Sequence, residues 1–161
     1  MPERTYSWED PAVLAVASRE MSGLDFLTAL AEGRLPPLPA LATAGITARE
    51  FSDGYALFTL EPAPYQYNSI GSIHGGILST LADSAVGCAV QTKLPAGTGY
   101  TSLDLQIRFT RAVTIESGPL RCEGRVVSFG RRAATADARI TDMTGRVMAH
   151  ASSTCIILAP D

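Results

Sequence analysis

Alternating apolar and polar residues predict a run of antiparallel strands in the second half of the chain. Residues 103–110 alternate strictly, with leucine, isoleucine and phenylalanine at the odd positions, which is typical of a half-buried strand. Comparable stretches follow at 120–129, 133–142 and 146–158, and glycine-containing turns separate them. We therefore expect four strands in this half.

Two more strands and one long helix precede this half. Residues 44–61 contain two strand patterns that meet at Asp53-Gly54, a strong hairpin signal. Residues 75–91 form an apolar run of helical length, and Pro95-Ala96-Gly97 ends it. One helix segregated against an antiparallel sheet predicts an α+β fold.

The first forty residues predict a helical arm. Asp10-Pro11 is an N-cap followed by proline at the first helical position. Ser22 can cap a second helix over 24–32, which Gly33 would end. The proline-rich stretch 35–39 is stiff and extended. We therefore divide the chain into an acidic arm with its joint, 1–40, and a main domain, 41–161.

Composition narrows the function classes. The chain has 161 residues and a net charge of −3, so it offers no electrostatic basis for binding nucleic acid or an anionic membrane. Cys88, Cys122 and Cys155 are an odd number without motif spacing, which favours reduced thiols over a disulfide framework or a zinc site. No apolar run follows Met1 as a secretory signal would require. We expect a cytoplasmic protein without metal or cofactor.

The long helix carries a single ionisable side chain besides its cysteine, Asp83. A helix that is apolar on all sides is usually buried. An isolated buried carboxylate is costly, so it must be paired, protonated or functional. Local pairing with Ser79, Thr80 or a backbone amide is the structural alternative to a catalytic role.

His74-Gly75-Gly76 stands at the start of this helix. Unpaired amides at a helix N-terminus attract negative charge, and glycine lets a ligand approach closely. This arrangement suits the oxyanion that develops on a thioester carbonyl. A tight turn with a structural His74 would explain the three residues alone, but the following apolar helix with one aspartate makes the catalytic hypothesis stronger.

The stretch Asn68-Ser69-Ile70-Gly71-Ser72-Ile73-His74-Gly75-Gly76, followed by Leu81-Ala82-Asp83, resembles the signature of hotdog-fold acyl-CoA thioesterases of the phenylacetate-degradation (PaaI-like) type. The resemblance covers roughly residues 36–158. It implies a hotdog fold, in which a long central helix is wrapped by an antiparallel sheet. It also implies a homodimer whose two sheets are continuous, and the pairing of two dimers into a tetramer stays open.

The resemblance also implies roles for individual residues. The backbone N–H of Gly75 would bind the thioester oxygen, and Asp83 would act as nucleophile or general base. Asn68 would place substrate or water, His74 would orient the loop, and Ser102 would position the attacking water. The chain departs from some relatives in carrying Gly87, where they have a hydroxyl one helical turn after the acid.

Helix geometry adds a constraint that does not depend on the resemblance. Gly75 and Asp83 are separated by eight residues, a rise of about 12 Å. Catalytic contacts need about 3 Å, so one helix cannot apply both residues to the same carbonyl. A two-fold dimer would supply the second residue from an antiparallel copy.

The expected substrate is an aryl- or medium-chain acyl-CoA, whose phosphates need cations. Arg131 and Arg132, with Arg108 or Arg111, are the candidates, and Gly76 would contact substrate beside Gly75. Solvated strand or turn arginines are the structural alternative at each position.

Three other functions compete with thioester hydrolysis. A hotdog dehydratase or hydratase acting on 3-hydroxyacyl thioesters would need His74 as a proton-transfer base. A non-catalytic acyl-CoA-binding sensor would carry a DNA-binding unit, but the arm contains no basic recognition helix. A nucleophilic Cys88 paired with His74 or His150 is the third, although a buried free cysteine is usually an apolar filler.

Overall fold

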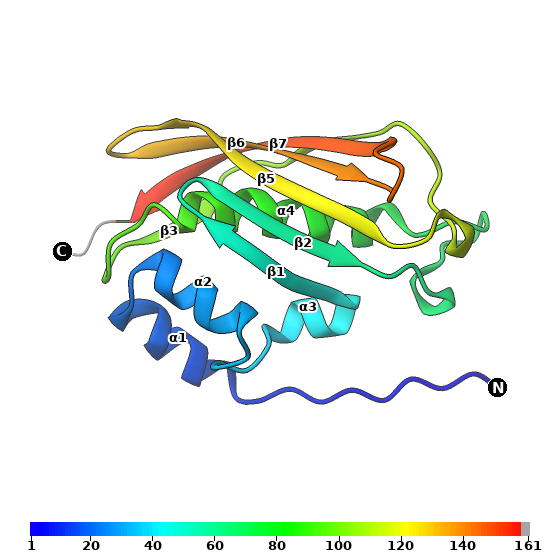
Figure 1. Cartoon of the computed structure of the whole chain (residues 1–161), viewed down its shortest axis with the longest axis horizontal. Coiled ribbons are helices and arrows are strands. Elements are labelled where there is room, and N and C mark those ends of the chain that lie inside the picture. Colours follow the sequence, from blue (N-terminus) through cyan, green and yellow to red (C-terminus); the bar gives the residue numbers. More distant parts are fainter. Residues whose placement is uncertain (159–161) are drawn as a thin grey trace.

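The computed structural model describes residues 1–158, which form a seven-stranded antiparallel sheet wrapped around one long helix (Figure 1). The helix, α4, spans Gly75–Gln91, as the sequence predicted. The strand order is β1-β2-β5-β6-β7-β3, and β4 also pairs with β7. The strands are β1 (Ile46–Ser52), β2 (Tyr55–Leu60), β3 (Gly99–Ser102), β4 (Gln106–Phe109), β5 (Leu120–Phe129), β6 (Ala133–Thr141) and β7 (Val147–Leu158). The predicted α+β hotdog fold is confirmed.

Three N-terminal helices lie beside the β1 edge of the sheet and below α4 in Figure 1. They are α1 (Pro11–Glu20), α2 (Gly23–Ala31) and α3 (Pro39–Ala44). The predicted caps form, because Asp10 accepts from the amide of Ala12 and Ser22 from that of Asp25. Buried arm residues join the same hydrophobic core as the sheet, namely Leu14, Phe26 and Leu27. The division of the chain at residue 40 stays a prediction.

The helix α3 was not predicted from the sequence. An extended joint was expected up to residue 39 and a strand from residue 44, but Pro39 begins a six-residue helix. Gly45 ends this helix in the left-handed conformation, with φ of 76°, which glycine adopts without steric cost. Six residues are too few for a helical period to be visible in the sequence.

The single strand predicted over 103–110 is also wrong. Only Gln106–Phe109 of this range forms a strand, β4, and a β-bulge at residues 103–105 separates it from β3, Gly99–Ser102, which was not predicted. Ser102 pairs with Cys155 and Gln106 pairs with Ser152, so three residues on this side face two on β7. The side chain of Asp104 accepts from the amide of Thr154 at the interruption. The extra residue reverses the inward face, so Ser102 points toward α4 while Leu103 is exposed.

The C-terminal half of α4 is packed very closely by its neighbours. A side chain at Gly124 of β5 would overlap the carbonyl of Ala85, and one at Gly23 of α2 would overlap that of Gln91. Glycine is therefore needed where the backbones meet.

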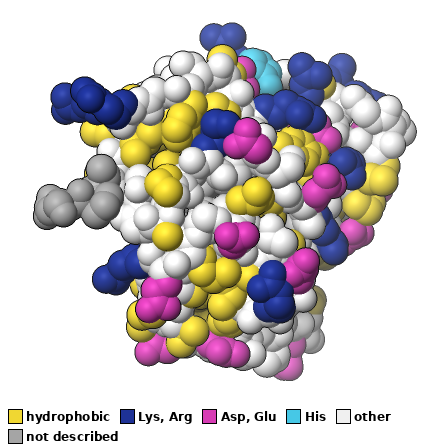
Figure 2. Space-filling model, turned by 60° about the vertical axis from the view of Figure 1, so that its left-hand side comes forward, with side chains coloured by type: hydrophobic (Ala, Val, Ile, Leu, Met, Phe, Trp, Pro, Cys, Tyr) yellow, Lys and Arg dark blue, Asp and Glu magenta, His cyan; other side chains and the backbone are white. Residues whose placement is uncertain are grey.

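Acidic side chains gather on the lower part of the molecule, where the arm lies, and basic ones project mainly from the upper part (Figure 2).

Candidate functional site

The N-terminus of α4 presents one free backbone donor. His74 is the N-cap, and its Nδ1 accepts a hydrogen bond of 2.9 Å from the amide of Gly76. Within the described residues 1–158, the amide of Gly75 has no hydrogen-bond acceptor. The Gly76 amide is therefore occupied by the cap, and the Gly75 amide is the donor that an oxyanion could use.

A cavity of about 330 Å³ opens at this free donor. Gly75 lines it together with Asn68, Phe109 and Arg111. The ring of Phe109 covers Gly75 so closely that an added Cβ would lie 3.1 Å from Cζ. This contact has no local sequence signal, because Phe109 lies on a strand 34 residues away along the chain.

Asn68 folds its own loop in this structure. Its Oδ1 accepts from the amides of Ile70 and Ser72, and its Nδ2 donates to Ser72 Oγ at 3.0 Å. These bonds hold the loop that leads to His74 and form one wall of the cavity. Contact of Asn68 with substrate or water stays a prediction.

A second cavity, of about 360 Å³, lies farther along the same helix. Asp83 lines it with Ser79, Thr80 and Ser102. Ser102 Oγ donates to Asp83 Oδ1 at 3.1 Å, which leaves Oδ2 free to accept from another donor. The local pairing of Asp83 with Ser79 or Thr80 does not form, since these hydroxyls donate to the carbonyls of Gly75 and Gly76.

The predicted burial of Asp83 is wrong for the single chain, in which this residue is exposed. The sheet covers only one side of α4, and the side that carries Gly76, Thr80 and Asp83 faces outward. One chain therefore has two separate candidate half-sites on one exposed face, an amide at Gly75 and a carboxylate at Asp83.

Cys88 is unsuited to nucleophilic attack. It is buried, and desolvation raises the pKa of its thiol to about 12, which keeps it protonated near neutral pH. Burial also raises the pKa of Tyr100, which hydrogen-bonds with Cys88. His150 is exposed on β7, and His74 lies at the far end of α4 from Cys88, so neither histidine can activate the thiol.

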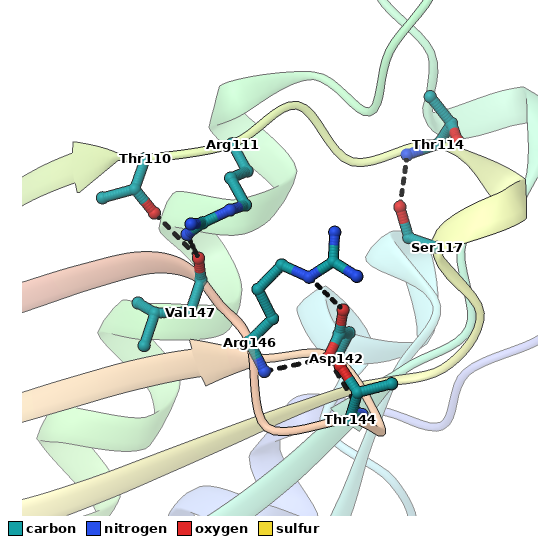
Figure 3. Close-up of polar contacts among 8 residues, drawn as sticks. All are labelled: Thr110, Arg111, Thr114, Ser117, Asp142, Thr144, Arg146 and Val147. Carbon is teal, nitrogen blue, oxygen red and sulfur yellow. Dashed lines mark hydrogen bonds and ion pairs between the residues drawn. The ribbon is translucent and has the colours of Figure 1, made fainter.

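The candidate phosphate ligands are divided between two places. Arg111 borders the Gly75 cavity and donates to the carbonyl of Val147 at 2.7 Å, where Thr110 converges on the same oxygen (Figure 3). Arg131 and Arg132 are exposed in the turn between β5 and β6 and line neither cavity of their own chain. This turn lies near the C-terminal end of α4, because Lys93 sits over the ring of Phe129.

The polar end of the β6–β7 hairpin is separate from both half-sites. Asp142 Oδ1 accepts from Thr144 Oγ1 and from the amides of Thr144 and Arg146 (Figure 3). These bonds lower the pKa of Asp142, chiefly through Thr144. Asp142 therefore fixes a turn.

Among residues 1–158, no three histidine, cysteine or acidic side chains are grouped to hold a metal, and no helix is long and apolar enough to cross a membrane.

The model of the thioesterase superfamily matches residues 70–149, which include both half-sites. One solved protein of that superfamily is 30% identical, with a TM-score of 0.68, and the match covers 83% of this chain and 97% of that one. The chain belongs to the thioesterase superfamily. No curated protein matches it.

Two further solved structures resemble this thioesterase-superfamily chain in fold. A phenylacetic acid degradation-related protein from Ralstonia eutropha JMP134 is 24% identical, with a TM-score of 0.71 over 81% of this chain and 98% of that one. A Streptococcus mutans UA159 protein, solved with bound acetyl-CoA, is 24% identical, with a TM-score of 0.65 over 71% of this chain and 90% of that one.

Proposed function

We propose that this protein is an acyl-CoA thioesterase of the phenylacetate-degradation type, whose active sites are each shared by two copies of the chain. The separation of the two half-sites carries the proposal. Gly75 and Asp83 lie in different cavities of one chain, about 12 Å apart along the helix. Each half-site lacks the group that the other offers.

The proposed chemistry needs the thioester carbonyl to be held at Gly75 of one copy and to lie beside Asp83 of the other copy, which acts as the base or the nucleophile. The Gly75 amide would bind the thioester oxygen and stabilise its negative charge during attack. Asp83, held at Oδ1 by Ser102, would accept a proton from water at Oδ2 while the new C–O bond forms. The C–S bond then breaks, and the proton passes to the leaving thiolate. Direct attack by Asp83, followed by hydrolysis of the resulting anhydride, uses the same arrangement.

An unpaired edge and an exposed helix face supply the surface for the second copy. The helix face with Gly76, Thr80 and Asp83 is uncovered, and β3 and β4 have strand partners on one side only among the described residues. Leu103 and Phe109 are 61% and 50% exposed beside it, although large apolar side chains favour burial. A two-fold, antiparallel pairing here would bring each Gly75 to the other copy's Asp83.

The proposed substrate is an aryl- or medium-chain acyl ester of coenzyme A. Acetyl-CoA bound to the S. mutans protein of similar fold supports a CoA-ester ligand. Arg111 borders the Gly75 cavity, and the partner's turn with Arg131 and Arg132 would reach the same end in an antiparallel pair. These cations would then hold the phosphates.

Dehydration of a 3-hydroxyacyl thioester would use His74 as a base. His74 Nδ1 already accepts from the Gly76 amide, which supports its role as a cap for the loop. Hydration of crotonyl-CoA without thiol release would favour the dehydratase, whereas thiol release across a panel of acyl-CoA esters supports the thioesterase.

The shared site can be tested by mixing two inactive variants. Gly75→Pro removes the free donor, and its position suits proline because His74 has extended φ and ψ of −60° and 133°. Gly75→Ala is the matched control, since it adds a similar contact with Phe109 but keeps the N–H. Gly75→Pro and Asp83→Asn should each be nearly inactive alone.

Random subunit exchange makes half of the dimers mixed, and each mixed dimer has one intact and one doubly damaged site. About a quarter of native activity should therefore return on mixing. Confirmed subunit exchange without recovered thiol release would show that each site is built within one chain, and would overturn the shared site.

A further inference from the structure

Gln66 is a buried amide that joins the end of α3 to the loop before α4. Its side chain is 2% exposed. Nε2 donates to the carbonyl of Ala44 at 2.8 Å, and Oε1 accepts from the amide of Ala63 at 2.9 Å. Both ends of the amide are paired, as a buried polar group requires. Gln66 therefore fixes the end of α3 against residues 63–66.

The backbone of Gln66 extends this link to the oxyanion donor. Its carbonyl accepts from the amide of His74 at 2.8 Å. His74 in turn caps α4 through the amide of Gly76. Gly75 lies between these two anchored residues, so the direction of its free N–H depends on where Gln66 holds His74.

The extended segment before α1 adds a second connection to the same place. The guanidinium of Arg4 donates to the carbonyls of Thr43 and Ala42 at 2.7 and 2.6 Å. A cation is favourable there because carbonyls at a helix C-terminus carry partial negative charge. The same guanidinium stacks over the ring of Tyr65, 4.0 Å from its centre. Arg4 thus clamps α3 to the residue next to Gln66.

Close packing keeps this connection rigid. Gly45, which ends α3, has φ of 76°, and a side chain there would overlap the hydroxyl of Tyr65 and lie 3.0 Å from Gln66 Nε2. The hydroxyl and the amide occupy the space that glycine leaves open. α3, Tyr65 and Gln66 therefore cannot shift independently.

We propose that Gln66 is a positioning residue for the oxyanion-binding turn, and that Arg4 reinforces it from the N-terminal arm. The inference rests on the proposed role of the Gly75 amide. A donor must lie within about 3 Å of the developing oxyanion, and a displacement of about 1 Å can cost on the order of a hundredfold in rate. The arm would thereby contribute to catalysis without touching substrate.

Gln66→Met tests this role, because methionine has a similar length and no amide. The expected result is a fall in kcat of about 10- to 100-fold with little change in KM, as loss of a contact made mainly in the transition state requires. Arg4→Ala should lower kcat by a smaller factor, about 2- to 5-fold. Hydrogen exchange at the amides of residues 74–78 should become faster in both variants.

Two matched variants control for loss of stability alone. Thr92→Val removes a buried hydroxyl at the opposite end of α4, which accepts from Gly54 and donates to Ala89. Arg34→Ala removes an arm arginine paired only with exposed Glu32. Both should leave kcat and the exchange at residues 74–78 unchanged at temperatures where all variants are folded.

Unchanged kcat and unchanged local exchange in Gln66→Met would overturn the proposal. A uniform rise in exchange over the whole chain, with no larger rise at residues 74–78 than elsewhere, would also overturn it. If Gln66→Met does not fold, Arg4→Ala decides, since its exposed side chain can be removed without opening the core. If the native protein releases no thiol from any acyl-CoA, the proposed function fails separately, and the exchange experiment still tests the positioning.

Discussion

The two halves of α4 differ in both composition and surroundings. Residues 75–84 include two serines, a threonine and an aspartate, whereas residues 85–90 have no side chain more polar than a thiol. From Ala85 to Val90 every residue is buried, and neighbouring strands and helices press against the backbone at Gly23, Gly87 and Gly124. From Gly75 to Ser84 only Leu78, Leu81 and Ala82 are buried. The first half therefore holds its functional groups on an open face, while the second half anchors the helix.

This difference shows which part of α4 has no packing partner within its own chain. The surrounding strands and helices bury the C-terminal half and leave one side of the N-terminal half exposed. Thr80 and Asp83 form a short polar stripe on the exposed side of this otherwise apolar helix. The uncovered part is the part with both half-sites, which agrees with the proposal that a second copy covers and completes it.

The largest effect is expected from Asp83→Asn in the open half. It keeps the shape and removes the charge, so kcat for thiol release should fall by at least ~100-fold. The melting temperature should change little, because asparagine has the same shape and its Oδ1 can still accept from Ser102 Oγ. Asp53→Asn, in an exposed ion pair with Lys93, is the charge-matched control. A folded Asp83→Asn protein with native kcat would return Asp83 to a structural role.

A substitution that clashes with the packed half of α4 should lower stability and leave activity nearly unchanged. Gly124→Ala would push a methyl group into the carbonyl of Ala85, and overpacking of this kind costs about 2–3 kcal/mol. Urea denaturation should report that loss, while activity per folded molecule changes little. Gly99→Ala is the control, since its Cβ would lie 3.8 Å from Leu158 Cβ, an ordinary contact. Equal stability of the two variants would contradict close packing at Gly124.

Replacing Arg131 and Arg132 together by alanine tests whether the turn between β5 and β6 of one copy lies beside the Gly75 cavity of the other copy. If the partner's turn binds the nucleotide, KM should rise about tenfold for an acyl-CoA and remain unchanged for the corresponding acyl-pantetheine, with kcat preserved. Replacing Arg121 and Arg125 together by alanine is the charge-matched control, because both are β5 arginines paired with Glu123. A similar change in KM for both substrates would exclude this placement of the phosphates.

The smallest effect is expected from thiol reagents at Cys88, in the packed half. Its pKa of about 12 keeps the native thiol protonated at pH 8, so alkylation followed by mass spectrometry should find it unmodified until the protein unfolds. The unfolded thiol ionises near pH 9, so the free energy of unfolding should decline as pH rises from about 9 toward 12. Rapid modification of native Cys88 would mean that this half opens.

Much of the fold could be predicted from local pattern. The strand alternation predicted β5, β6 and β7 within a residue of their ends, and Asp53-Gly54 located the hairpin of β1 and β2. The caps Asp10 and Ser22 are local interactions and were predicted correctly. The bulge between β3 and β4 could not be predicted, because it depends on the register with β7, about 50 residues later.

The candidate site divides in the same way. The sequence by itself determined that Gly75 begins a helix, that Asp83 is its lone carboxylate, and that about 12 Å of helix separates them. Only the tertiary structure decided that Asp83 is exposed, that the bulge turns Ser102 toward it, and that Gln66 links the end of α3 to His74. The physical reason is the distance along the sequence between the residues that interact. Helix rise and caps follow from neighbouring residues, whereas exposure and side-chain contacts depend on which distant strands and helices pack beside them.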